Sequence, residues 1–296
     1  MNTNFFLLGL DGGGTGSRVV MADSGGLVLA HAVGGPSGLG LGIGPAWQAI
    51  TASCREAFAM AGVAPEWSRC VLGCGLAGAN NPVWLAQFRQ QAPDFAGLVV
   101  ESDAYTTLLG AHGGGPGVIV ALGTGSVAAA GQMGAWRMAS GYGFPSGDEA
   151  SGAWLGLRAI VHAQQALDGR VADDSLARAL LTQVGAQDRD SLIAWLCNAN
   201  QTAYAALAPI VFAHQAHPFA AQLLSDAGAE IAKMVTALDA SSELPVALCG
   251  GLAAPLHAFV PQPLRQRLCV PLGDSAQGAL QLARQEADRL SREATR

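Results

Sequence analysis

The chain has 296 residues, of which 50% are hydrophobic and 13% are charged, and its formal net charge is −6. This length suits two domains or one large one, and the apolar content excludes an extensively disordered chain. The acidic balance gives no basis for a surface that binds nucleic acid or an anionic membrane. Every apolar run is too short to span a membrane, and Met1–Phe6 lacks the charged region of a signal peptide, so a cytoplasmic protein is expected.

Two residue types narrow the chemistry further. Lys233 is the only lysine, so the chain has no P-loop, which needs a lysine beside its glycines. The six cysteines form no C-x-x-C pair and lie mostly in apolar runs, which predicts buried thiols in a reducing compartment.

The first part of the chain predicts a β-meander followed by alternating helices and strands. Glycine-rich turns separate the first three apolar runs, and Trp47, Ile50 and Cys54 then recur at helical spacing, in a helix that begins near Pro45 and ends at Gly62. The predicted strands are Phe5–Leu10, Arg18–Ala22, Leu27–Val33, Arg69–Leu76 and Leu98–Glu101, and further helices cover Trp84–Gln91 and Ala104–Ala111.

A glycine-rich linker at 112–117 precedes a second segment with the same plan. Strands are expected at Val118–Leu122, Val127–Ala130 and Ala135–Met138, again with a glycine turn after the first. Residues 148–240 have helical spacing, 245–249 form one more strand, and 275–295 form an amphipathic helix. The chain therefore contains two weak copies of one βββαβαβ unit.

The glycine turn of each copy is a candidate phosphate-binding loop. Asp11-Gly12-Gly13-Gly14-Thr15 follows a strand, and its glycines allow backbone N–H groups to face an anion without a lysine. The aspartate is suited to holding Mg²⁺ through water. A plain hairpin turn would explain this motif alone, but Gly123-Thr124-Gly125 repeats the chemistry in the second copy.

The second turn also fits the dinucleotide-binding pattern G-x-G-x-x-A. That fingerprint requires a helix directly after the glycines. The residues that follow Gly125 are β-like, so this interpretation is rejected.

Taken together, the ordered motifs resemble the eukaryotic-type N-acetylglucosamine kinase family. That family includes bacterial glucosamine kinases and lies within the BadF/BadG/BcrA/BcrD ATPase group. The motifs are Leu8–Thr15, Gly73–Gly78, Glu101–Ala104, Ala121–Ser126, Gly141–Ser151 and Leu248–Gly251, and they cover nearly the whole chain.

The resemblance implies an α/β protein with duplicated actin-like ATPase (ribonuclease H-like) domains and an interdomain cleft. Residues 1–115 would form the first domain, with a helix at about 275–296 packing back on it. Residues 116–274 would form the second domain, with a helical insertion. The implied activity is ATP- and Mg²⁺-dependent phosphorylation of the 6-hydroxyl of an amino sugar, with N-acetylglucosamine favoured and glucosamine as the alternative.

The resemblance also implies a role for each matching residue. Asp103 corresponds to the catalytic base and Asp11 to the residue that orients Mg²⁺. Phosphate and adenosine contacts fall on Gly12, Gly13, Gly14, Thr15, Gly123, Thr124, Gly125, Gly250 and Gly251. Sugar contacts fall on Ser37, Asp103, Tyr142, Gly143 and Asp148.

Each role has a purely structural alternative. Asp103 and Asp148 would suit helix N-caps, and Tyr142 would suit a core position. The pair Gly250-Gly251 would suit a turn from strand to helix.

One departure from the family pattern bears on the sugar. Family members carry an asparagine after Pro-Ser in the loop that follows the third strand, whereas this chain reads Pro36-Ser37-Gly38. Ser37 is the available substitute, and the identity of the sugar is left open.

Two other classes of function are retained as alternatives. Activators of 2-hydroxyacyl-CoA dehydratases belong to the same broad group and need cysteines for an iron–sulfur cluster, and Cys70 and Cys74 share one face of a predicted strand. A non-catalytic sensor that binds ATP or sugar would share the same motifs. A homodimer is expected from the family alone.

Overall fold

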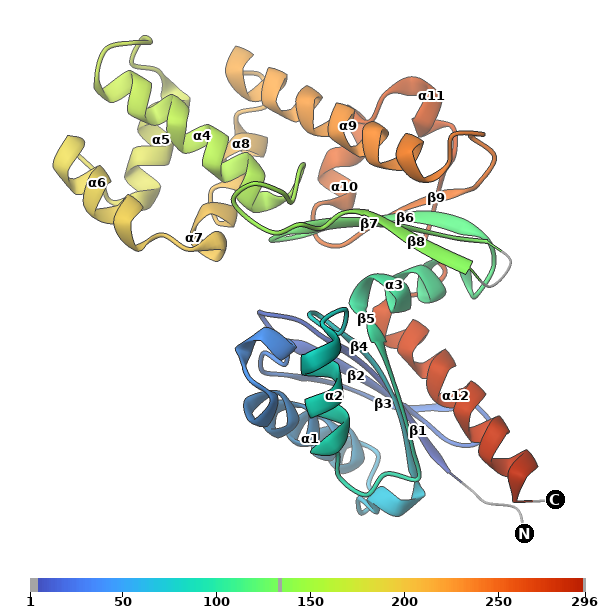
Figure 1. Ribbon diagram of the computed structural model, residues 1–296. Coiled ribbons are helices and arrows are strands. Elements are labelled where there is room, and N and C mark those ends of the chain that lie inside the picture. The colour runs from blue at the N-terminus through green and yellow to red at the C-terminus, as the bar shows by residue number, and fades with distance from the viewer. Residues whose placement is uncertain (1–4, 133–134, 295–296) are drawn as a thin grey trace. The chain divides into compact units, whose positions relative to one another are not determined.

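The computed structural model describes residues 5–132 and 135–294 and contains two five-stranded sheets (Figure 1). Each sheet belongs to a separate structural unit. The first unit combines the chain up to Pro116 with the residues from Pro271 onward, and the second unit is Gly117–Val270.

The sheet of the first unit begins with an antiparallel meander and continues with two parallel strands. Its strand order is β3-β2-β1-β4-β5, and β1 pairs in parallel with β4, which pairs in parallel with β5. The strands are β1 (Phe6–Gly12), β2 (Ser17–Ala22), β3 (Val28–Gly34), β4 (Cys70–Leu76) and β5 (Gly97–Ser102). Because β1, β3, β4 and β5 all run in the same direction, the loops that follow them meet at one edge of the sheet.

Helices cover both faces of this sheet. On one face, α1 packs over a core that includes Leu8, Leu10 and Phe58. On the other face, α12 lies along β1 and β4 and also contacts α3, as Figure 1 shows. The helices are α1 (Ile43–Met60), α2 (Pro82–Gln90), α3 (Asp103–His112) and α12 (Ser275–Glu293), and short 3₁₀ turns cover Leu39–Leu41 and Trp67–Arg69.

Glycines allow α12 to approach the sheet and α3 at backbone distance. Gly9 of β1 and Gly73 of β4 are paired, and a Cβ on either would overlap the backbone of α12. A Cβ on Gly110 of α3 would overlap Asp274, and one on Gly278 of α12 would overlap Thr106. A buried hydrogen bond of 2.8 Å between the Thr106 and Ser275 hydroxyls joins the same two helices.

The second unit repeats the sheet of the first. Its order is β10-β9-β6-β7-β8, so the antiparallel meander β6–β8 and the parallel neighbours β9 and β10 stand where β1–β3, β4 and β5 stand in the first sheet. The strands are β6 (Gly117–Leu122), β7 (Ser126–Gln132), β8 (Ala135–Ser140), β9 (Val246–Cys249) and β10 (Leu268–Cys269). This repetition confirms the predicted α/β fold with duplicated actin-like ATPase domains.

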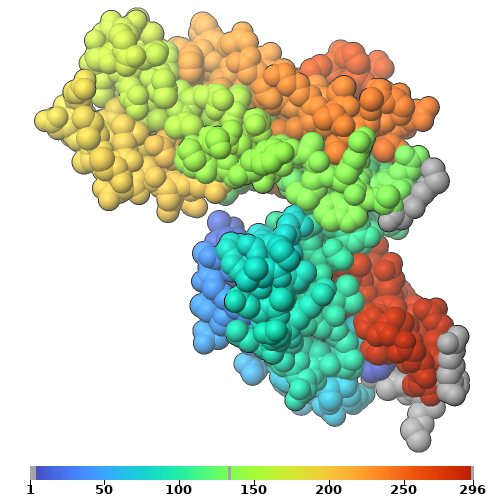
Figure 2. All heavy atoms as spheres, viewed as in Figure 1, coloured from blue at the N-terminus to red at the C-terminus, as the bar shows by residue number. Residues whose placement is uncertain are grey.

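A long helical segment separates β8 from β9. Its core is one apolar cluster built mainly from α4 and α9 against the sheet. Figure 2 shows the atoms of α6, in yellow, at one end of this unit. The helices of the unit are α4 (Gly152–Leu167), α5 (Ser175–Val184), α6 (Arg189–Asn198), α7 (Gln201–Ala205), α8 (Ala208–Ala213), α9 (Pro218–Leu238), α10 (Ala253–Leu256) and α11 (Gln262–Arg265), with a 3₁₀ turn at His257–Phe259.

The predicted elements are present, with small shifts in their bounds. Helix α1 begins at Ile43, ahead of the proline that was expected to start it. Residue 295, the predicted end of the last helix, lies outside the described residues. Within the described ranges, no helix combines the length and apolar character needed to cross a membrane.

The contact between α12 and the sheet yields a test of stability. Gly73→Ala is expected to lower the free energy of unfolding by about 1–3 kcal/mol or more, because the new methyl group overlaps the backbone of α12. Gly44→Ala is the control. Gly44 lies in α1, and a Cβ there meets nothing within 4 Å. Denaturant unfolding of both variants measures the difference, and equal stability of the two would contradict the packing argument.

Candidate active site

The turn between β1 and β2 is tied to the loops that follow β3 and β4. The carbonyl of Gly13 accepts hydrogen bonds from the backbone N–H groups of Ser37 and Gly38, both at 3.0 Å. The carbonyl of Gly12 accepts from the N–H of Ala77 at 2.9 Å. These bonds hold two of the predicted motifs, Leu8–Thr15 and Gly73–Gly78, and the loop that carries Ser37 together at one edge of the first sheet.

The glycines of this turn fall into two groups with different physical causes. A Cβ on Gly12 would overlap Ser37 and Leu76, so packing alone requires that glycine. A Cβ on Gly14 meets nothing within 4 Å, and one on Gly13 meets only a carbonyl oxygen at 3.9 Å. Neither residue has a positive φ, so neither packing nor backbone conformation accounts for glycine at these two positions. An open backbone there lets an anion approach the N–H groups.

Asp11 lies opposite Arg18 across the hairpin and forms an ion pair with it. The guanidinium donates to Asp11 Oδ2 at 2.7 Å from Nη2 and at 3.3 Å from Nε. Arg18 also lies 3.5 Å from Asp274. Hydrogen bonding to Asp11 raises the pKa of Arg18, and a cation at Asp11 would share the carboxylate with this guanidinium.

Asp103 is the first residue of α3, directly after β5, and is not the N-cap of that helix. The N-cap is Ser102, whose hydroxyl accepts a hydrogen bond from the N–H of Tyr105 at 3.2 Å. Asp103 Oδ1 accepts one bond, from the N–H of Ala104 at 2.9 Å. Burial, together with the negative charge of Asp11, raises the pKa of Asp103 above its ordinary value. The capping explanation for this aspartate is therefore wrong, because its neighbour performs that role.

Ser37 is completely buried, and its hydroxyl lies against Gly12. Within the described residues, its Oγ is the buried side-chain oxygen that has no hydrogen-bond partner. An unpaired buried hydroxyl is unfavourable by about 1–3 kcal/mol. The Ser37 hydroxyl is therefore a candidate for bonding to a ligand.

In the second unit, the turn between β6 and β7 is attached to the start of α4. The carbonyls of Gly123 and Thr124 accept from the N–H groups of Gly152 and Ala153, at 2.8 and 3.2 Å. A Cβ on Gly123 would meet only a carbonyl oxygen at 4.0 Å, so this position is as open as Gly13 in the first unit.

Asp148 lies beside this turn and is almost fully buried. A Cβ on Gly125 would come within 2.6 Å of Asp148 Oδ2, so the glycine makes room for the carboxylate. The same oxygen accepts from Gln201 Nε2 at 2.6 Å, and the N–H groups of Ser126 and Gly143 also bond the carboxylate. Burial nevertheless raises its pKa. The N-cap of α4 is Ser151, so the capping explanation for Asp148 is also wrong.

The loop that carries Asp148 has an unusual backbone. Ser140, Asp148 and Ala150 have φ values of 61°, 59° and 64°, in the left-handed region that non-glycine residues rarely adopt. Such strain persists where the surrounding structure determines the conformation, and it is common at functional sites.

Tyr142 lies in the same loop with 88% of its surface exposed, between Gly141 and Gly143, both with positive φ. The core explanation for this tyrosine is therefore wrong. An aromatic ring held away from the protein surface is available to a ligand.

The last predicted pair, Gly250 and Gly251, follows β9. Gly250 has a φ of 88°, and a Cβ there would overlap Leu122 at the end of β6. A Cβ on Gly251 meets nothing within 4 Å. Gly250 is thus explained by the turn itself, whereas Gly251 has no packing reason to be glycine.

Each unit presents open glycine backbone at strand ends, and the first unit also has a carboxylate there. In the first unit, Asp11 supplies the oxygen ligand that Mg²⁺ prefers, and Gly13 and Gly14 leave room for an anionic ligand. In the second unit, Gly123 and Gly251 leave room in the same way. The residues of the first unit fit a phosphate group with a bound magnesium ion.

Two residues of the candidate site were not predicted from the sequence. Gln201, the partner of Asp148, is 53 residues away in the chain, and its own neighbourhood carries no motif. Arg18, the partner of Asp11, was detectable, because a strand-to-strand turn at 12–17 places positions 11 and 18 opposite each other.

The cysteines of β4 are poorly placed for an iron–sulfur cluster. Cys70 and Cys74 are both completely buried in the first unit. Burial raises the pKa of Cys70 to about 12 and that of Cys74 well above its ordinary value, so the thiolate forms that ligate iron are disfavoured.

Fold and glycine turns together define a two-domain ATPase of the actin-like class. Residues 8–267 match the BadF/BadG/BcrA/BcrD ATPase family, and the chain belongs to that family.

Individual relatives are also similar over nearly their full lengths. The glucosamine kinase of Vibrio cholerae is 31% identical over 281 residues, which are 94% of this chain and 95% of that protein. A solved structure from Chromobacterium violaceum, assigned provisionally as an N-acetylglucosamine kinase, is 49% identical with a TM-score of 0.92 and covers 95% of this chain and 99% of its own. A second provisional N-acetylglucosamine kinase, from Porphyromonas gingivalis, shares the fold at 18% identity with a TM-score of 0.73, over 95% of this chain and 99% of its own.

The open glycines of the first turn yield a test of nucleotide binding. Gly14→Ala is expected to weaken ATP binding by about 10- to 100-fold, because a methyl group there would obstruct the approach of a phosphate to the N–H groups of the turn. Stability should be unchanged, since the Cβ meets nothing within 4 Å. Gly44→Ala, equally open but within α1, is the control for both measurements. Unaltered ATP affinity in the Gly14 variant would remove this turn from the nucleotide site.

Proposed function

We propose that this protein is an ATP-dependent kinase that phosphorylates the 6-hydroxyl of an amino sugar. The observation that carries the proposal is Asp103, a partly buried carboxylate at the end of β5 that is not needed as a helix cap. It lies at the same edge of the sheet as the open glycine turn. A base beside a phosphate-binding turn is the arrangement that phosphoryl transfer requires.

In the proposed reaction, Asp103 accepts the proton of the sugar 6-hydroxyl. The freed oxygen forms a bond to the γ-phosphorus of ATP, and the bond between that phosphorus and the β,γ-bridging oxygen breaks to release ADP. The raised pKa of Asp103 makes its carboxylate a stronger base than that of an exposed aspartate.

The remaining site residues bind and orient. In the proposal, the N–H groups of Gly13, Gly14 and Gly123 hold phosphate oxygens, with Thr15, Thr124 and Gly125 beside them, and Gly251 faces the adenosine. Mg²⁺, held near Asp11, would neutralise phosphate charge when bound. Arg18 keeps the Asp11 side chain oriented through its two hydrogen bonds.

The sugar is proposed to be N-acetylglucosamine, with glucosamine as the second candidate. The first follows from the 49% identical protein of Chromobacterium violaceum, and the second from the 31% identical glucosamine kinase of Vibrio cholerae. Tyr142 is the proposed stacking surface for the sugar ring, and Ser37 a proposed hydroxyl contact.

The proposed activity also bears on the location of the protein in the cell, and the family on its oligomeric state. Because ATP is the phosphoryl donor, we expect the reaction to take place in the cytoplasm. A homodimer remains a prediction from the family, which light scattering of the purified protein would test.

The base assignment has a direct test. Asp103→Asn is expected to lower kcat by about 10²- to 10⁴-fold, because the amide cannot accept the proton. Stability at pH 7 should be equal or higher, since an acid with a raised folded-state pKa is destabilising when ionised. The control is Asp94→Asn, an exposed aspartate before the opposite end of β5. Near-normal turnover by the Asp103 variant would refute the assignment.

The raised pKa of Asp103 also predicts the acid limb of the pH profile. As pH falls through this pKa, the carboxylate is protonated and kcat/KM decreases, at a higher pH than an unperturbed aspartate would give. Steady-state rates of ADP release, measured between about pH 4 and about pH 8, determine where this limb lies. A profile with no acid limb in that range would contradict the prediction.

A sugar panel tests substrate and reaction class together. We expect ADP release with N-acetylglucosamine or glucosamine to exceed that with glucose. Tyr142→Ala should raise the KM for the preferred sugar by about 2- to 10-fold with little change in stability, because the ring is exposed.

Ligand binding without ADP release from any hexosamine would favour a sensor. Iron and labile sulfide in anaerobically purified protein would favour the dehydratase-activator class.

A further inference from the structure

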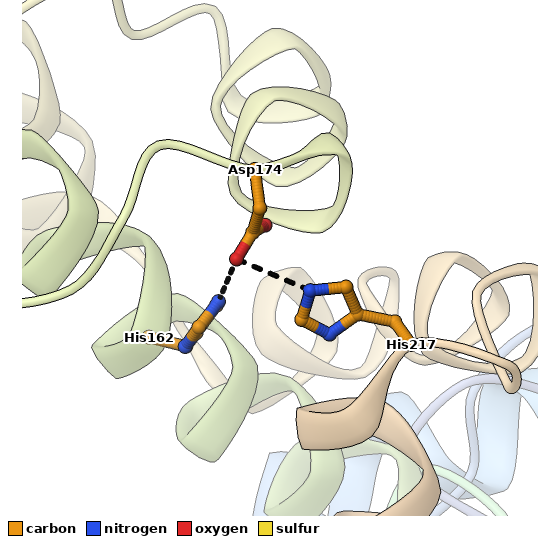
Figure 3. Close-up of side chains that lie close together, drawn as sticks. All are labelled: His162, Asp174 and His217. Carbon is orange, nitrogen blue, oxygen red and sulfur yellow. Dashed lines mark hydrogen bonds and ion pairs between the residues drawn. The ribbon is translucent and has the colours of Figure 1, made fainter.

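Three metal-ligating side chains converge in the helical part of the second unit. His162 lies in α4, Asp174 immediately precedes α5, and His217 immediately precedes α9 (Figure 3). His162 Nε2 lies 2.9 Å from Asp174 Oδ2, and His217 Nε2 lies 3.2 Å from the same oxygen. One ligand atom from each residue lies within 4.8 Å of the other two. Among the described residues, this is the one group of three histidine, cysteine, aspartate or glutamate side chains whose ligand atoms are this close together.

The three side chains are held in place by contacts outside the cluster. The ring of His162 stacks on Phe219 with centroids 4.2 Å apart, which fixes its orientation. Asp174 Oδ1 accepts from the N–H of Ala177 at 2.8 Å, so Oδ2 is directed to the histidines. Preorganised ligands of this kind lower the free-energy penalty of ordering a metal site.

We propose that His162, Asp174 and His217 bind one Zn²⁺ ion. Imidazole nitrogen and carboxylate oxygen are ordinary zinc ligands, at about 2.0–2.2 Å from the ion. Two ligands of a tetrahedral ion at that distance lie about 3.3 Å apart, close to the 2.9 and 3.2 Å that separate the two Nε2 atoms from Asp174 Oδ2. The side chains of Asp174 and His217 are 23% and 20% exposed, so the cluster is in contact with solvent, which would supply water as the fourth ligand.

A metal-free cluster is the alternative that the same atoms allow. In it, both imidazoles donate Nε2–H to Asp174 Oδ2, and His217 Nδ1 accepts from the N–H of Phe219 at 3.3 Å. Zinc at His217 Nε2 places the proton on Nδ1 and displaces this long hydrogen bond. Both Nε2 atoms are directed at one oxygen, one from α4 and one from the residue before α9, and that convergence favours an ion.

The bound ion would link three elements that are distant in sequence. It would join α4, which begins just after the Asp148 loop, to the first turns of α5 and α9. Its role would be structural, because the cluster contains none of the residues assigned to phosphate or sugar. The inference is therefore independent of the kinase proposal.

Zinc titration of the full-length protein, treated beforehand with a chelator, tests the site. We expect about one equivalent of Zn²⁺ to bind and to raise Tm, since a ligand that binds only the folded state stabilises it. His217→Asn and Asp174→Asn should each weaken binding about tenfold or more and abolish the Tm increase. Both substitutions retain a side-chain acceptor for the helix N-cap, so the fold should persist.

His214→Ala is the matched control, because His214 lies three residues before His217 and its ring bonds the carbonyl of Ile210 in its own helix, while the bond from the N–H of His217 goes to the backbone carbonyl of His214, which the substitution keeps. It should bind zinc like the unmodified protein. Equal zinc affinity in the two cluster variants, or binding well below one equivalent, would overturn the proposal and leave the metal-free cluster.

Cobalt substitution identifies the ligands directly. Co²⁺ at this site should give a tetrahedral visible spectrum without the near-ultraviolet band of a thiolate ligand. Such a band would place the ion on a cysteine such as the exposed Cys197, and would also overturn the proposal.

Discussion

The backbone contact between α12 and the first sheet is the constraint on which the first half of the candidate site depends. Gly9, Gly73, Gly110 and Gly278 remove every side chain that would hold this helix away from β1, β4 and α3. Because α3 is fixed in this way, its first residue, Asp103, is fixed at the end of β5. The position of the proposed base thus depends on residues that never approach a ligand.

Glycines in this chain therefore have two kinds of cause, and the structure separates them. Gly12, Gly125 and Gly250 are required by the side chains or backbone that lie against them. Gly14 and Gly251 have open space and no left-handed backbone, as does Gly44 in α1, but they lie in turns that follow strands, where the proposed nucleotide contacts fall. A glycine-rich motif alone supports binding weakly, and open glycines at the strand ends of the candidate site add to that support.

The sequence was sufficient for the order of strands and helices along the chain and for the two glycine turns, because glycines interrupt the apolar runs and the same plan occurs twice. It was insufficient wherever a site residue depends on a distant partner. The bond from Gln201 to Asp148 spans 53 residues and forms only when α4 to α7 are packed. The burial of Ser37 and the convergence of His162, Asp174 and His217 likewise arise from tertiary packing, and no local pattern encodes them. The sequence left a helix N-cap open as the structural alternative for Asp103 and Asp148, because the serines that are the actual caps, Ser102 and Ser151, lie only one and three residues away and serine and aspartate cap equally well.

The return of α12 to the first unit has a consequence for biosynthesis. The chain leaves that unit at Pro116 and comes back only at Pro271, after the whole second unit has been made. During translation, the face of the sheet that carries Leu7 and Val71 therefore stays uncovered until α12 has emerged from the ribosome. An N-terminal fragment of this protein would expose that apolar face, so the unit that is synthesised first is completed last.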